Sequence, residues 1–201
     1  MKSFIWSMSF LCLLMSSVCF ADDHRKPFGG YIAVGLTGLD DDAALEEGVD
    51  DSLFSVKLGV EMYRSAWVLG GGFSVFFYDD NEEFKQAVED IGGDVSTEDS
   101  SAMATNLFVE SGYRHVFSEN LFVDLLAGYE YVVSSERSIS NCRDCFEEDI
   151  EISSGFYLAP RFQFKKDNGL TISLIYQQHL SSDVDNSIML AVGVSRKARL
   201  F

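Results

Sequence analysis

The residues with the most evident chemical potential are His179 and Ser181, which are separated by one residue. A serine hydroxyl becomes a nucleophile when a histidine accepts its proton and a carboxylate orients that histidine. Asp183 and Asp185 are the nearest acids downstream. The pattern is short, and a polar histidine and serine at a strand end also suit a solvated rim. His179 and Ser181 are therefore catalytic candidates, while a non-enzymatic role is favoured.

The amino terminus predicts export. Lys2 precedes an apolar stretch, Phe4 to Phe20, which closes at Ala21 before two aspartates, and this is the pattern of a secretory signal peptide cleaved after Ala21. Cleavage leaves Cys142 and Cys145 as the remaining cysteines. In an oxidising compartment these two thiols are expected to close a small disulfide ring. No histidine lies beside them, so a zinc site is not predicted.

The charge balance excludes one class of partner. The chain has 15 Lys and Arg against 32 Asp and Glu, a formal net charge of -17. Nucleic acid is not expected as a partner, because phosphate binding needs a basic surface. The chain also contains 17 Phe, 8 Tyr and 16 Gly. An explanation of the fold must account for this combination of acidic, aromatic and glycine residues.

The elements that would position these groups are strands. Apolar and polar residues alternate with period two in eight segments, as expected for strands with two different faces. Short connections alternate with long ones, which predicts an up-and-down meander with all short turns at one end. We expect Met62 opposite Trp67, Phe117 opposite Leu121 and Phe164 opposite Leu170. The segments are Phe28 to Leu36, Phe54 to Met62, Trp67 to Phe77, Met103 to Phe117, Leu121 to Val133, Ile150 to Phe164, Gly169 to His179 and Ser187 to Ser195.

The polar face is predicted to point into a narrow barrel. That face is rich in glycine, which weakens a solvated strand but leaves space for large residues in a crowded interior. The apolar face then points outward to lipid. The glycines concerned are Gly59, Gly70, Gly72, Gly112, Gly128, Gly155 and Gly193.

Charged residues on the polar face predict a buried cluster. If the turn between two segments is centred on Glu119, Arg114 and Asp124 lie directly opposite each other. Glu61 and Arg161 lie at a similar height above their own turns. Buried charges must be paired, because an isolated one costs several kcal/mol. We therefore predict that Glu61, Arg114, Asp124 and Arg161 fill the lumen near the short-turn end.

From Phe28 to about Arg196 the chain resembles the small eight-stranded outer-membrane barrels of Gram-negative bacteria, the outer membrane protein A transmembrane domain and outer membrane protein X type. The resemblance implies an all-β, antiparallel, up-and-down transmembrane β-barrel with short periplasmic turns and long acidic extracellular loops. The expected organisation is a signal peptide (1–21), a short segment (22–27) and a barrel domain (28–201). Phe201 matches the terminal aromatic residue of that family. Girdle aromatics at the membrane boundaries would be Phe28, Tyr63, Trp67, Phe77, Phe117 and Tyr131.

Two features of the last segment depart from that family. Phe201 has the inward parity of Met189, and basic residues from Arg196 onward interrupt the apolar face. Either the strand ends near Ser195, or a bulge resets its register.

The resemblance implies an integral outer-membrane protein that is not an enzyme and acts in envelope integrity, surface interaction or adhesion through its acidic loops. One alternative is a lipid A deacylase-type hydrolase, because His179 and Ser181 are similar to the His-x-Ser of those barrels, although Ser182 stands where they usually have Asn. A soluble periplasmic lipocalin-like barrel is the other alternative. A diffusion porin is disfavoured, because side chains fill a lumen of this size.

The partners implied are outer-membrane lipid and lipopolysaccharide, the barrel assembly machinery and periplasmic chaperones, and the chain is expected to be a monomer. No cofactor is expected. Acidic loops could bind Ca²⁺ or Mg²⁺ weakly, since hard cations take carboxylate oxygens. However, Asp40, Asp41 and Asp42 lack the ligand spacing of a dedicated calcium loop, so solubility is the favoured role of these acids.

Overall fold

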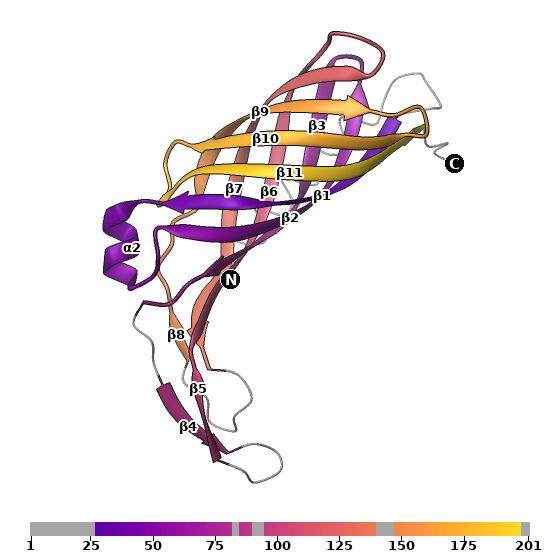
Figure 1. The fold of residues 1–201 in the computed structure, drawn as a ribbon. Coiled ribbons are helices and arrows are strands. Elements are labelled where there is room, and N and C mark those ends of the chain that lie inside the picture. Colours follow the sequence, from indigo (N-terminus) through magenta and orange to yellow (C-terminus); the bar gives the residue numbers. More distant parts are fainter. Residues whose placement is uncertain (1–26, 82–84, 90–94, 140–146, 198–201) are drawn as a thin grey trace, which may run out of the picture.

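The structure, a computed structural model, describes residues 27–81, 85–89, 95–139 and 147–197. Within these ranges eight long strands form one antiparallel barrel (Figure 1). The predicted signal peptide, the predicted disulfide between Cys142 and Cys145, and Phe201 lie outside the described residues. The barrel strands are β1 (Pro27–Leu39), β2 (Ser52–Arg64), β3 (Trp67–Tyr78), β6 (Ser101–Val116), β7 (Leu121–Ser138), β9 (Gly155–Lys165), β10 (Leu170–His179) and β11 (Val184–Lys197).

Each barrel strand pairs with its sequence neighbours, and the β1–β11 pairing closes the ring. This confirms the predicted eight-stranded up-and-down topology. In the described residues, no helix is long and apolar enough to cross a membrane. β11 runs past Ser195 to Lys197 and pairs regularly there with the start of β1, so neither an early end nor a bulge near Ser195 is present.

The predicted hairpin registers are correct at one turn and wrong at two. Arg114 lies opposite Asp124, and the Phe117 amide donates to the Leu121 carbonyl. In contrast, Met62 lies opposite Leu69 and Phe164 lies opposite Ile172. Both errors are shifts of two residues, which leave every side chain on its predicted face.

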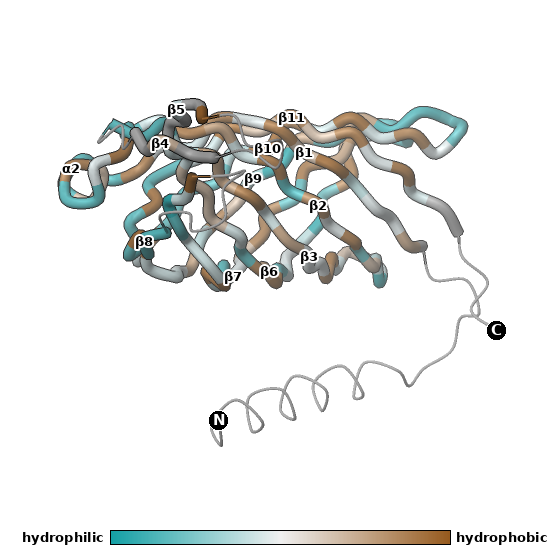
Figure 2. Tube along the Cα trace, turned by 90° about the horizontal axis from the view of Figure 1, so that it is seen from below, coloured by the Kyte–Doolittle hydropathy of each residue, from teal (hydrophilic) through white to brown (hydrophobic). Residues whose placement is uncertain are grey.

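The apolar face of the barrel points outward. Large apolar side chains such as Leu107, Leu174 and Leu190 are exposed, whereas the alternate residues of the same strands are buried in the lumen. Hydrophobic residues recur along the strands, while α2 (Asp41–Glu47) and β8 (Glu147–Asp149) are largely hydrophilic (Figure 2). The soluble lipocalin-like alternative is therefore wrong, because such a barrel turns its apolar face inward.

One assignment to the aromatic girdles is also wrong. Tyr63 is buried, and its hydroxyl donates to the Glu61 carboxylate inside the lumen. The two residues are two positions apart on β2, so they share the inward face. Phe28, Trp67, Phe77, Phe117 and Tyr131 are exposed, as girdle residues must be.

The long connections lie at one end of the barrel and carry short elements that the strand pattern did not predict (Figure 1). Helix α2 begins after Asp40, whose side chain accepts from the Asp42 and Ala43 amides, and it ends at Gly48 in a left-handed conformation. β4 (Lys85–Glu89) pairs with β5 (Val95–Asp99) in a separate hairpin, and β8 pairs with β7.

Apolar residues from these connections and from the strand ends close the lumen at the loop end. They form one buried cluster, which consists of Leu39, Ala44, Val49, Leu53, Phe76, Tyr78, Ala102, Ala104, Ile150, Ile152 and Val184.

Candidate functional site

The structure brings together the four residues predicted to form a lumen cluster. Arg114 donates two hydrogen bonds of 2.7 Å to Asp124, from Nε to Oδ1 and from Nη2 to Oδ2. Arg161 donates to Asp124 Oδ2 at 2.6 Å and 2.9 Å and also to Glu61. Asp124 and Arg161 are almost completely buried. Each cation therefore has a carboxylate partner, as burial in a lumen requires.

A second polar layer surrounds Lys57. Its ammonium group donates to Tyr157 OH and to Gln177 Oε1, both at 3.2 Å, and lies 3.8 Å from Glu110 Oε2. The ammonium is also 3.9 Å from the centre of the Phe108 ring, a cation–π distance. Together the two layers place large, buried side chains in the lumen.

Close packing of these layers depends on glycine. A Cβ atom at Gly59 would lie 2.5 Å from the ring of Tyr31, its partner across β1 and β2. Tyr157 covers Gly128 in the same way across β7 and β9. The inward glycines thus provide the space that the lumen aromatics occupy, as the sequence predicted.

The structure does not bring the two predicted catalytic residues together. The ring nitrogens of His179 contact Gln177 Nε2 at 2.8 Å and Ser182 Oγ at 3.2 Å. The Ser181 hydroxyl instead accepts from the Phe156 amide at 3.2 Å. Strand β10 ends at His179, so the period-two rule that would place residue 181 beside residue 179 no longer applies.

Sequence reasoning missed the second lumen layer and the partners of His179. Lys57, Glu110 and Glu130 have the same inward parity as the four predicted charges on their strands. The prediction that the polar face points inward therefore already places them in the lumen, but it does not group them. Their mutual contacts depend on barrel shear, which brings together strands that are not sequence neighbours.

At the loop end, Arg137 forms hydrogen bonds with residues of three different connections. Its guanidinium donates to Asp80 Oδ2 at 2.8 Å, to Glu148 Oε2 at 2.9 Å and to the Glu47 carbonyl at 2.7 Å. Arg137 is only 3% exposed. We call the loop-end surface organised by these contacts the loop platform, consisting of α2 with Gly48 to Asp51, Asp79 to Asn81 and β8.

Replacing Arg137 by Gln is expected to loosen the loop platform without unfolding the barrel. Hydrogen bonds to charged groups each contribute roughly 1.5–3 kcal/mol to stability. The equilibrium constant for local opening of the loops should therefore rise about tenfold or more. The rate of cleavage by a glutamate-specific protease, measured in lipid vesicles, reports this opening. Lys166→Gln in the turn at the opposite end is the matched control. An unchanged cleavage rate in the Arg137 variant would contradict the role assigned to this residue.

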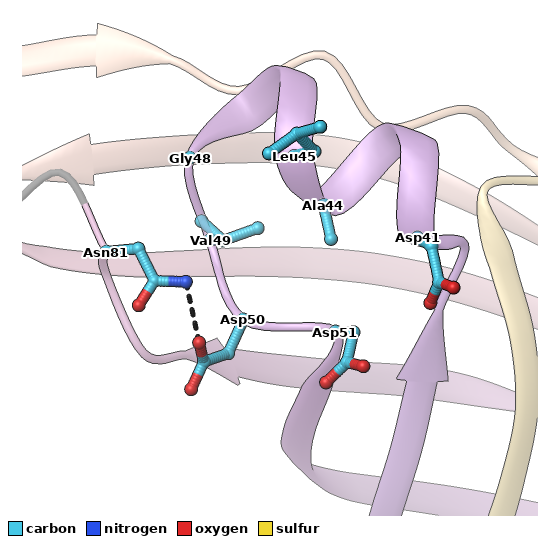
Figure 3. Close-up of a pocket in the computed structure, with 8 residues that line it drawn as sticks. All are labelled: Asp41, Ala44, Leu45, Gly48, Val49, Asp50, Asp51 and Asn81. Carbon is cyan, nitrogen blue, oxygen red and sulfur yellow. Dashed lines mark hydrogen bonds between the residues drawn. The ribbon is translucent and has the colours of Figure 1, made fainter.

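A pocket of about 430 Å³ opens on the loop platform beside α2 (Figure 3). Ala44, Leu45 and Val49 supply apolar lining, and Leu45 is 83% exposed. The polar lining consists of Asp41, Asp50, Asp51 and Asn81, whose amide nitrogen donates to Asp50 Oδ1 at 2.6 Å.

The platform has carboxylates but no cluster suited to a tightly held metal. Across the described parts of the chain, no group of three or more His, Cys, Asp or Glu side chains could hold a metal ion. Weak binding of Ca²⁺ or Mg²⁺ at the acidic loops stays a prediction.

Comparison with known proteins agrees with this geometry. A family model described as the outer membrane protein beta-barrel domain matches residues 8–197. The solved structure of Ail, the attachment invasion locus protein of Yersinia pestis, is 13% identical, with a TM-score of 0.52 over 86% of this chain and 99% of that chain. Neisserial surface protein A is 9% identical, with a TM-score of 0.49 over 86% of this chain and 97% of that chain. No curated protein sequence matches the chain.

Proposed function

The chain belongs to the outer membrane protein beta-barrel family and resides in the outer membrane of a Gram-negative bacterium. We propose that it is a surface-binding protein whose loop platform recognises basic polypeptide segments. In this proposal the barrel is a filled anchor, neither an enzyme nor a pore. The platform is the binding surface.

The observation that carries the proposal is the one-sided charge of the platform. Among the described residues at the loop end, the basic residues are Lys85 and Arg137, and Arg137 is buried against carboxylates. The exposed acids around them are Asp40, Asp41, Asp42, Glu46, Asp51, Asp79, Glu147, Glu148, Asp149, Glu151 and Asp185. Such a surface attracts positively charged partners and accelerates their association.

The pocket beside α2 supports a lysine or arginine side chain as the recognised group. These side chains lay their aliphatic stems on apolar surface and keep the charged end among polar groups. Ala44, Leu45 and Val49 would contact the stem, and Asp41 and Asp51 lie at the same opening as acceptors for the charge. The pocket volume falls within the usual range for ligand sites.

A polyanionic ligand fits this surface poorly. Ail was solved in complex with a heparin analogue, sucrose octasulfate. Sulfate groups would meet repulsion at the acidic platform of this chain. The proposed partner therefore has the opposite charge from the ligand in that structure.

The double variant Asp41→Asn, Asp51→Asn is expected to weaken binding of a lysine-rich peptide about tenfold. The reason is that each lost charge pair at a partly exposed site contributes about 1 kcal/mol or less. The measurement is peptide affinity for the full chain in nanodiscs. Two further results should accompany it: weaker binding at high salt, and no binding of the peptide with acetylated lysines. Asp167→Asn, in the turn at the opposite end, is the control. Equal affinity of the double variant and this control would refute the proposed pocket.

A further inference from the structure

One buried carboxylate in the lumen lacks the cation that its neighbours have. Asp124 and Glu61 pair with arginine, and Glu110 lies near Lys57. Glu130 is 4% exposed, and within the described residues no lysine or arginine forms an ion pair with it. Its oxygens accept from the Ser74 hydroxyl and, at 3.3 Å, from Gln177 Nε2. A buried carboxylate held only by neutral donors is unfavourable unless another positive charge is present.

His179 does not supply that charge in this arrangement, although its Nε2 atom lies 3.8 Å from Glu130 Oε2. Lys57 donates to Gln177 Oε1, which fixes the Gln177 amide nitrogen as a donor. That nitrogen lies 2.8 Å from His179 Nε2. Because Nε2 accepts this hydrogen bond it bears no proton, and a histidine is positively charged only when both ring nitrogens are protonated.

An unpartnered oxygen lies in the same layer. Asn106 is fully buried, and its Oδ1 atom has no hydrogen-bond partner. The Asn106 amide nitrogen donates at 3.4 Å to Ser74 Oγ, the same hydroxyl that donates to Glu130. The amide of Asn106 and the carboxylate of Glu130 therefore flank one serine. Buried oxygens without a protein partner are normally satisfied by water or an ion.

We propose that a monovalent cation, Na⁺ or K⁺, binds in the upper lumen to the carboxylate of Glu130 and to Asn106 Oδ1. A single carboxylate with neutral oxygens suits a monovalent ion, since divalent calcium sites draw on several carboxylates. The ion supplies the missing positive charge and stabilises the filled barrel. This inference is independent of the loop platform and its partner.

The test compares unfolding of the full chain in nanodiscs in potassium, sodium and N-methyl-D-glucamine chloride at equal ionic strength. The last cation is too large for a buried site. We expect an unfolding equilibrium constant about tenfold smaller in the preferred small cation, as for an ion present at roughly ten times its Kd. Equal stability in all three salts would overturn the proposal.

Variants locate the effect. Glu130→Gln and Asn106→Leu should each abolish the dependence on the cation. Glu110→Gln, which removes a different buried lumen carboxylate, should lower stability but keep the dependence. Loss of the dependence in the Glu110 variant, or its persistence in Glu130→Gln, would contradict the site.

A measurement on the native chain keeps the proposal testable if the variants do not fold. Thallium(I) substitutes for K⁺ and scatters anomalously. In thallium-soaked crystals, an anomalous peak between Glu130 and Asn106 supports the site, and the absence of a peak at these residues overturns it.

Discussion

Replacing Asp124 by Asn is expected to lower the free energy of unfolding by about 3–5 kcal/mol, the usual loss when one partner of a buried ion pair is removed. Asp124 accepts hydrogen bonds from both Arg114 and Arg161. In the variant, Arg161 keeps Glu61 and Arg114 keeps Gln163. The cluster of four then holds two guanidinium groups but only one carboxylate, Glu61, so the positive charge of Arg114 loses its carboxylate partner.

The measurement is the urea midpoint in lipid vesicles, followed by tryptophan fluorescence and by the heat-sensitive gel mobility of the folded barrel. Asn matches Asp in size, so the change isolates charge from packing. The matched control is Asp167→Asn, which removes an exposed carboxylate in the β9–β10 turn. If both variants unfold at the native midpoint, the cluster does not stabilise the barrel.

Apolar alternation predicts which face of the barrel each residue occupies, but it does not fix the register of a hairpin. The alternation has period two, so a hairpin shifted by two residues keeps all its apolar side chains on the same face. The apolar pairs predicted at Met62 and at Phe164 are wrong by two residues. The apolar pair predicted at Phe117 is correct, and the same register places Arg114 opposite Asp124 on the polar face.

The loop end was less predictable, because its structure depends on contacts between connections. Asp40 and Gly48 are typical helix-capping residues, but Asp40 to Asp42 suggested only an acidic loop. Arg137 shows why: it lies on β7, and its acceptors come from three separate connections. The alternation of apolar and polar residues along a strand does not indicate partners that lie in distant connections.

The orientation of the barrel in lipid gives the second large expected effect. Leu174 lies midway along β10 on the outward face, between Leu190 and Phe162 on the neighbouring strands, and is 50% exposed. Replacing it by Arg is expected to destabilise the barrel in lipid vesicles by about 2–4 kcal/mol, the cost of a cation on the lipid face near the bilayer midplane. Urea unfolding in vesicles measures this change.

The control is Leu45→Arg on α2, where the leucine is even more exposed, at 83%. If water surrounded both positions, each substitution would change the free energy of unfolding by no more than about 0.5 kcal/mol, as is usual for exposed residues. A lipid-facing belt predicts a large effect at Leu174 and none at Leu45, so the more exposed leucine should be the more tolerant one. Equal tolerance at both positions would mean that the apolar face does not contact lipid. The difference between the two variants therefore separates burial in a bilayer from exposure to water, which accessibility alone does not distinguish.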